Sequence, residues 1–162
     1  MSEKEMFLNS WEREYQTTVK VLKAYPADKL DFKPHERARS AKELAWTIVA
    51  EEPILVNGGI TGKFDFEHMP KPPATMNDVL SQYDRGHVDL VAKVKNLSDT
   101  AFNNTVKFMV APKTMGDLRC ADVCWMMVMD TVHHRGQFSV YLRMAGGRVP
   151  SIYGPSGDEP WM

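Results

Sequence analysis

Helical periodicity over four long segments constrains the fold of this chain more than any other feature. In each segment, apolar side chains recur at spacings of three and four residues, which places them along one face of an α-helix. The first segment runs from about Ser2 to Tyr25, and its apolar face consists of Leu8, Trp11, Tyr15, Val19 and Leu22. Helices bury such faces against each other, so the chain is expected to be all-α and to form a four-helix bundle.

The second helix and the connection after it predict how the helices are ordered. Ser40 and Glu43 have the spacing of a capping box, and Pro53 is expected to kink the helix or to end its regular part near Glu51. Residues 57–74 contain three glycines and three prolines and form a predicted crossover of about 18 residues. Antiparallel neighbours need only a short connection, so this length predicts an up-down-down-up order with the second and third helices parallel.

The third and fourth helices have signals of their own. Thr75 caps the third helix, whose inner face carries His87 among the apolar residues Leu80, Tyr83, Leu90 and Val94. Residues 96–114 follow, and their apolar part, 106–111, is expected to be extended and folded over the bundle. The fourth helix is predicted from about Met115 to Ala145, because Gly146 and Gly147 form a typical helix end.

The size and charge of the chain exclude several classes of protein. Its 162 residues fit one domain, 1–162, and a formal charge of -1 does not favour a nucleic-acid partner. The longest strictly apolar run, Val123–Met129, has seven residues and is too short to cross a membrane. The first residues do not form a signal peptide, so a cytoplasmic location is expected. Cys120 and Cys124 are predicted to be reduced core residues.

The predicted fourth helix carries a carboxylate and an imidazole one turn apart. Asp130 and His134 are in phase with Val123 and Met127, so both are expected on the inner face, where they could bind one metal ion. Alternatively, His134 is a neutral core histidine that forms a hydrogen bond with Asp130. The spacing by itself leaves both interpretations open.

A longer string around these two residues resembles a known family. Residues 130–137 read D-T-V-H-H-R-G-Q and are followed by Y-L-R at 141–143 and by Gly146. DinB-like (DinB/YfiT) proteins have H-x-x-x-H-R-G-Q at this place, E-L-x-x-H in the second helix, here residues 43–47, and a tail similar to residues 149–158. The resemblance implies a four-helix bundle over essentially the whole chain, often assembled as a homodimer.

The same resemblance implies a metal site with an altered set of ligands. In that family three histidines commonly bind a divalent metal such as zinc or nickel, and the matching positions here are Thr47, Asp130 and His134. A carboxylate is an ordinary metal ligand, whereas a threonine hydroxyl is a poor replacement for an imidazole. The three-histidine site is therefore changed at two of its positions.

Two further residues are candidates to complete this site. Glu51 lies one turn beyond Thr47, and His87 lies on the inner face of the third helix at a similar predicted depth. Glu51, His87, Asp130 and His134 could therefore converge in one layer. Without a metal, Glu51 could pair with His87 or His134, since a buried carboxylate needs a partner.

Three other residues of the string have less specific interpretations. His133 points about 100° away from His134 around the helix and is expected at the surface. Gly136 indicates either a close approach of a helix or ligand, or a tolerated surface glycine. Arg135 could hold an acidic substrate, although a salt-bridged arginine is more common.

Two functions follow from these observations. The resemblance implies a metal-dependent transferase that acts on a small-molecule thiol, with zinc or nickel held by the altered site. The alternative is a non-catalytic, metal-free, dimeric bundle with a binding or stress-associated role. The sequence does not identify a catalytic residue or an organic cofactor.

Overall fold

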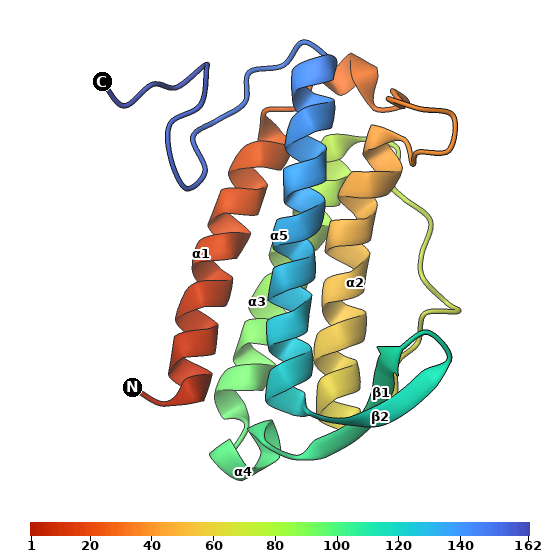
Figure 1. The fold of residues 1–162 in the computed structure, drawn as a ribbon, viewed down its shortest axis with the longest axis vertical. Coiled ribbons are helices and arrows are strands. Elements are labelled where there is room, and N and C mark those ends of the chain that lie inside the picture. The colour runs from red at the N-terminus through yellow and green to blue at the C-terminus, as the bar shows by residue number, and fades with distance from the viewer.

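Four long helices lie side by side in the computed structural model, which describes residues 1–162 (Figure 1). They are α1 (Glu3–Lys23), α2 (Ala41–Thr61), α3 (Met76–Asn96) and α5 (Cys120–Met144). In Figure 1, α1 and α5 run upward and α2 and α3 run downward. Both α5 and α3 pack against α1 and α2, so α2 and α3 are parallel neighbours joined by the long connection.

The helix starts follow the predicted capping signals. The side chains of Ser2 and Ser40 each accept a hydrogen bond from the backbone N–H of the glutamate three residues later. The side chains of Glu5 and Glu43 in turn accept from the backbone N–H of these serines, so both capping boxes form. Thr75 caps α3 through the backbone N–H of Asp78. These local signals are read correctly from the sequence because each involves residues within one turn.

The second helix continues beyond the predicted break at Pro53 and ends at Thr61. The Asn57 side chain donates a hydrogen bond to the Pro53 carbonyl at 2.8 Å. Gly58 and Gly59 belong to this helix, and a Cβ at Gly58 would lie 2.1 Å from the ring of Phe64. The prediction that the crossover begins at residue 57 was therefore wrong, because close tertiary packing favours these glycines inside the helix.

A two-stranded hairpin precedes the last helix. Strand β1 (Thr105–Ala111) pairs antiparallel with β2 (Thr114–Arg119), and a short helix, α4 (Asp99–Phe102), lies before them. The extended segment 106–111 is confirmed, but residues 115–119 form a strand and not the start of the fourth helix. The protein is thus mostly helical with a small sheet, and the all-α expectation is corrected in this region.

The core consists of two hydrophobic clusters and several buried polar residues. The cluster of 16 residues includes Tyr25, Leu44 and Phe138, and the cluster of 13 residues includes Phe7, Val56 and Val123. The buried polar residues outside these clusters are Glu14, Thr18, Ser40, Thr47, Glu52, His87, Thr131 and Arg135. Both cysteines are buried and free, and none of the helices is long and apolar enough to cross a membrane.

Candidate metal centre

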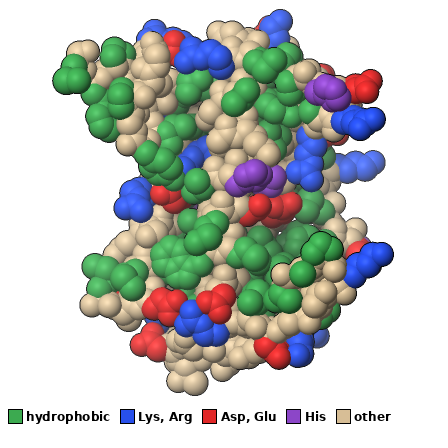
Figure 2. All heavy atoms as spheres, viewed as in Figure 1, with side chains coloured by type: hydrophobic (Ala, Val, Ile, Leu, Met, Phe, Trp, Pro, Cys, Tyr) green, Lys and Arg blue, Asp and Glu red, His purple; other side chains and the backbone are tan.

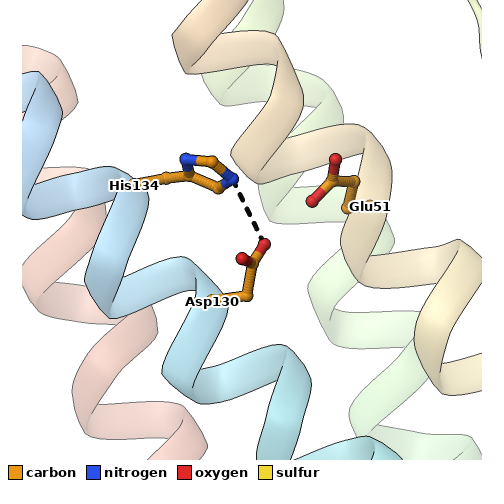
Figure 3. A group of neighbouring side chains, drawn as sticks. All are labelled: Glu51, Asp130 and His134. Carbon is orange, nitrogen blue, oxygen red and sulfur yellow. Dashed lines mark ion pairs between the residues drawn. The ribbon is translucent and has the colours of Figure 1, made fainter. Parts of the chain in front are cut away.

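Glu51 on α2 and Asp130 and His134 on α5 approach each other where these two helices pack (Figure 3). One ligand atom from each residue lies within 4.8 Å of the others, and all three side chains are partly buried. Figure 2 shows histidine and acidic side chains next to each other near mid-height of this face of the molecule. The side chains of His134 and Asp130 are 15% and 37% exposed, so the cluster is reachable from solvent.

His134 is oriented by contacts at both ring nitrogens. Its Nε2 lies 3.4 Å from Asp130 Oδ2, and its Nδ1 lies 3.1 Å from Gln137 Oε1. The Gln137 amide nitrogen in turn lies 3.0 Å from His133 Nε2. An amide oxygen only accepts, so it selects the His134 tautomer with the proton on Nδ1. The Nε2 lone pair then faces the two carboxylates, as a metal ligand requires.

Glu51 and Asp130 form a close pair of acids. Burial raises the pKa of Glu51 to about 7, together with a hydrogen bond to Asp130 and the negative charge of Asp130. The positive charge of Arg39 has a smaller effect in the opposite direction. Glu51 therefore keeps its proton over much of the acidic range, next to Asp130. A divalent cation between them would replace that proton and favour both ionised forms.

The donor set fits a divalent metal. Metal–ligand bonds to nitrogen and oxygen are about 2.0–2.2 Å, so ligand atoms around one ion lie about 3–4 Å apart. The ligand atoms lie within 4.8 Å of one another, so small side-chain rotations would bring them to these shorter distances. Two carboxylates and one imidazole also leave coordination positions for a further ligand, which is the arrangement of a reactive site and not of a closed structural one.

His87, which was expected in this layer, lies elsewhere. Its Nδ1 contacts Glu52 Oε1 at 3.0 Å, and its Nε2 contacts Glu12 Oε2 at 3.2 Å. Its ring is stacked on Tyr15 with a centroid separation of 3.8 Å. Consecutive residues of a helix point about 100° apart, so Glu51 faces α5 while Glu52 faces α3. The expected convergence of all four side chains was therefore wrong for His87.

Thr47 is buried one turn before Glu51 on α2. Its hydroxyl donates a hydrogen bond to the Glu43 carbonyl at 3.0 Å, so its proton is already used within the helix. Among the residues predicted for the metal site, Glu51, Asp130 and His134 are the ones whose ligand atoms come together.

The comparisons with known proteins agree with the sequence pattern. A sequence model of the DinB family matches residues 1–161. The chain belongs to the DinB family. The uncharacterized protein YrdA of Bacillus subtilis strain 168 is 27% identical over 154 residues, which cover 94% of this chain and 89% of that protein.

Solved structures of DinB-like proteins share the fold. A DinB-like protein from Bacillus cereus has a TM-score of 0.78 at 22% identity, with 92% of this chain and 97% of the other covered. The DinB-like protein YjoA from Bacillus subtilis has a TM-score of 0.73 at 17% identity, with 90% and 96% covered. A mutant of mycothiol-dependent maleylpyruvate isomerase has a TM-score of 0.53 at 14% identity, with 83% and 60% covered.

Three other residues of the DinB-family string on α5 lie outside the candidate metal centre. Arg135 is 2% exposed and pairs with Glu14 at 2.8 Å, so it is not free to hold a substrate. A Cβ on Gly136 would meet nothing within 4 Å, which agrees with a tolerated surface glycine. His133 is exposed, as predicted.

Two residues near the candidate sites were missed by the sequence reasoning. Glu52 was not singled out, although it is in phase with Ile48 and Val56, four residues to each side. That phase on a buried helix was a readable signal. Gln137 was noted as part of the family string, but its contact with His134 depends on side-chain orientation and carries no periodic signal.

Proposed function

We propose that this DinB-family protein, an up-down-down-up four-helix bundle, binds one divalent metal ion through Glu51, Asp130 and His134. The observation that supports this most is the approach of three ligand atoms from two helices to within 4.8 Å of one another. The raised pKa of Glu51 supports it as well, because paired acids without a cation retain a proton that a metal would displace.

We further propose that the bound metal serves a transfer reaction on a small thiol, and that the protein acts as a homodimer. A bound divalent ion lowers the pKa of a coordinated thiol and so provides a thiolate nucleophile. Gln137 would keep the His134 Nε2 lone pair directed at the site, and Glu51 would release its proton as the site fills. A protein of similar fold is named as a mycothiol-dependent isomerase, which is consistent with thiol chemistry on this architecture.

The altered ligands change the expected metal preference. Two carboxylates and one imidazole are harder donors than three imidazoles, so manganese and iron become competitive with zinc and nickel. The two negative charges also neutralise a divalent ion more fully. A thiol at this site is therefore expected to be acidified less than at a site with three histidines.

The metal content of untagged protein tests the proposal. Elemental mass spectrometry after loading with zinc, nickel or manganese and desalting is expected to find about one ion per chain. Glu51→Gln, Asp130→Ala and His134→Ala should each lower the metal affinity at least tenfold. His35→Ala is the matched control, because this exposed histidine lies outside the cluster and contacts none of its residues. Protein that takes up no ion, or variants that bind as tightly as wild type, would refute the site.

A metal-free, non-catalytic bundle is the second candidate function. It is supported by the proton that Glu51 retains next to Asp130, which lowers the negative charge of the cluster without a cation. The same measurement separates the two candidates. The second one requires that all loaded ions are lost on desalting.

A further inference from the structure

A cavity opens between α2, α3 and the connection that joins them. Its volume is about 380 Å³, within the range of small-molecule binding pockets. Its accessible lining surface is mostly apolar, and Trp46, Ile54, Met69 and Leu90 contribute to it. The Trp46 indole N–H donates a hydrogen bond to the Pro70 carbonyl, which attaches the connection to α2 at the edge of this cavity. None of Glu51, Asp130 and His134 lines it, so it is distinct from the candidate metal centre.

The cavity lining contains a buried acid and a buried imidazole. Glu52 is 2% exposed and His87 is 3% exposed, and they contact each other through Oε1 and Nδ1 at 3.0 Å. The other ring nitrogen of His87 is engaged by Glu12, and its ring is stacked on Tyr15. His87 is therefore held in place with both nitrogens in use.

The second carboxylate oxygen of Glu52, Oε2, is buried and has no hydrogen-bond partner. Buried polar atoms are nearly always paired, so an unpaired carboxylate oxygen at a cavity needs an explanation. Asp65 also lines the cavity, but it is exposed and already pairs with His68 at 2.8 Å. Glu52 is thus the buried acid of this cavity. Burial and the neighbouring Glu52 carboxylate raise the pKa of the Tyr83 hydroxyl, so this hydroxyl lies near Glu52, but Oε2 makes no hydrogen bond of ordinary geometry.

We propose that this cavity binds a small organic cation, an amine with an apolar body. A protonated amine would supply the missing donor to Glu52, and hydrogen bonds between two ionised groups are stronger than those between neutral ones. Trp46 and Tyr83 are both in the lining, and aromatic rings of this kind attract cations. The apolar lining would cover the body of the ligand.

Gly86 supports the proposal independently. It lies inside α3 and lines the cavity, and nothing lies within 4 Å of the position that a Cβ would take. Glycine is unfavourable inside a helix, and at this position no close packing requires it. A larger side chain here would extend across the cavity, so the glycine keeps the cavity open.

Calorimetric titration of the wild-type protein with three probes of the same shape tests the charge requirement. 2-Phenylethylamine is protonated, 2-phenylethanol is neutral and phenylacetate is an anion. The amine is expected to bind at least tenfold more tightly than the alcohol, and phenylacetate is expected not to bind. Tighter binding of phenylacetate would overturn the proposal and indicate recognition by Lys63 at the cavity rim.

Two variants test the location of binding. Glu52→Gln keeps the size of the side chain and its contact with His87 but removes the charge, and should weaken amine binding at least tenfold. Gly86→Leu should abolish binding by filling the cavity. Its matched control is Gly136→Leu, since Gly136 is also a helical glycine with open space but lies outside the cavity.

Circular dichroism checks that each variant folds, and folded Gly86→Leu protein that binds the amine like wild type would disprove the site. Neither variant alters a proposed metal ligand, so metal binding and amine binding can fail separately.

Discussion

Glu51 makes the metal-free protein sensitive to pH. Its pKa is about 7 in the folded protein and near 4.5 in the unfolded chain, so between these values the folded state retains a proton that the unfolded state has lost. The free energy of unfolding should therefore fall as pH rises from 4.5 to 7, by about 1–2 kcal/mol for this partly exposed group.

Urea denaturation in chelator, at several pH values between 4.5 and 8, measures this effect. Glu51→Gln cannot ionise, so its stability should decline less than that of the wild type over the same window. Parallel stability curves for the two proteins would show that the folded-state pKa of Glu51 is not raised.

Thr47 is the position at which the family pattern has a histidine. Thr47→His would add an imidazole one turn from Glu51 on α2, and imidazole binds zinc and nickel better than a hydroxyl does. We expect the affinity for zinc to rise about tenfold or more, measured by competition with a chromogenic chelator. Thr47→Val is the control for the loss of the hydroxyl, and equal affinities in both variants would place residue 47 outside ligand reach.

At the scale of elements, one buried ion pair helps to attach the C-terminal tail to the helices, in addition to the surface ion pairs Lys20–Glu159 and Arg143–Asp158. Arg135 on α5 pairs with Glu14 on α1, and the Tyr153 hydroxyl of the tail donates a hydrogen bond to Glu14 Oε2 at 2.6 Å. Burial acts to raise the pKa of Glu14, but hydrogen bonds from Tyr153 and Arg135 outweigh it and lower the pKa. The ionised carboxylate therefore joins α1, α5 and the tail.

Removal of Arg135 should destabilise the protein strongly. Arg135→Met leaves the buried Glu14 with only the exposed Arg13, at 3.6 Å, as a cation, which costs about 3 kcal/mol. Tyr153→Phe removes two hydrogen bonds, one to Glu14 and one from Arg135, and costs about 1–2 kcal/mol. Chemical denaturation measures both, and limited proteolysis should show that the tail becomes easier to cleave. Arg85→Met, at an exposed position of α3, is the control and should have little effect. A tail that stays protected in Arg135→Met would contradict this role.

Helix α2 supplies residues to both candidate sites from consecutive positions. Glu51 faces α5 and the candidate metal centre, while Glu52 faces α3 and the cavity. The difference of about 100° between neighbouring residues directs two similar side chains to different faces. The insertion or deletion of one residue before Glu51 in α2 would turn both side chains by about 100° around the helix and so disrupt both sites.

For the whole molecule, metal binding should raise thermal stability. An ion that binds only the folded state stabilises it by about 2.7 kcal/mol at a concentration 100-fold above the dissociation constant. For a chain of this length the corresponding rise in melting temperature is about 5–10 °C. Differential scanning calorimetry with manganese, zinc or nickel measures it, and a chelator should reverse it. The same shift in Asp130→Ala would show that the ion binds elsewhere.

The expected homodimer is testable through an exposed apolar face of α5. Met129, Val140 and Met144 are 67%, 57% and 55% exposed and lie on one side of this helix. Exposed apolar rows of this kind are common at contacts between proteins. We expect a dimer in sedimentation experiments and a monomer for Val140→Glu. Val88→Glu on α3 is a matched control, since Val88 is 65% exposed but stands on another helix. A monomeric wild type would disprove the expectation.

The sequence by itself determined that four long helices form, where three of them begin, and that Asp130 and His134 lie one turn apart on the last of them. These features depend on residues within one or two turns, where spacing alone decides which side chains meet. The family string is local in the same sense, which is why the resemblance was visible without a structure.

Only the tertiary structure decided which helix faces meet. The depth of Glu51 and His87 along their helices was similar, but their rotation about the helix axes separated them, and Glu52 took the place beside His87. Likewise, packing against Phe64 and the last helix kept α2 intact through Gly58 and Gly59, and pairing with β1 made residues 115–119 a strand. Contacts between distant segments outweigh local preference in each case, because they bury surface that a single segment cannot bury alone.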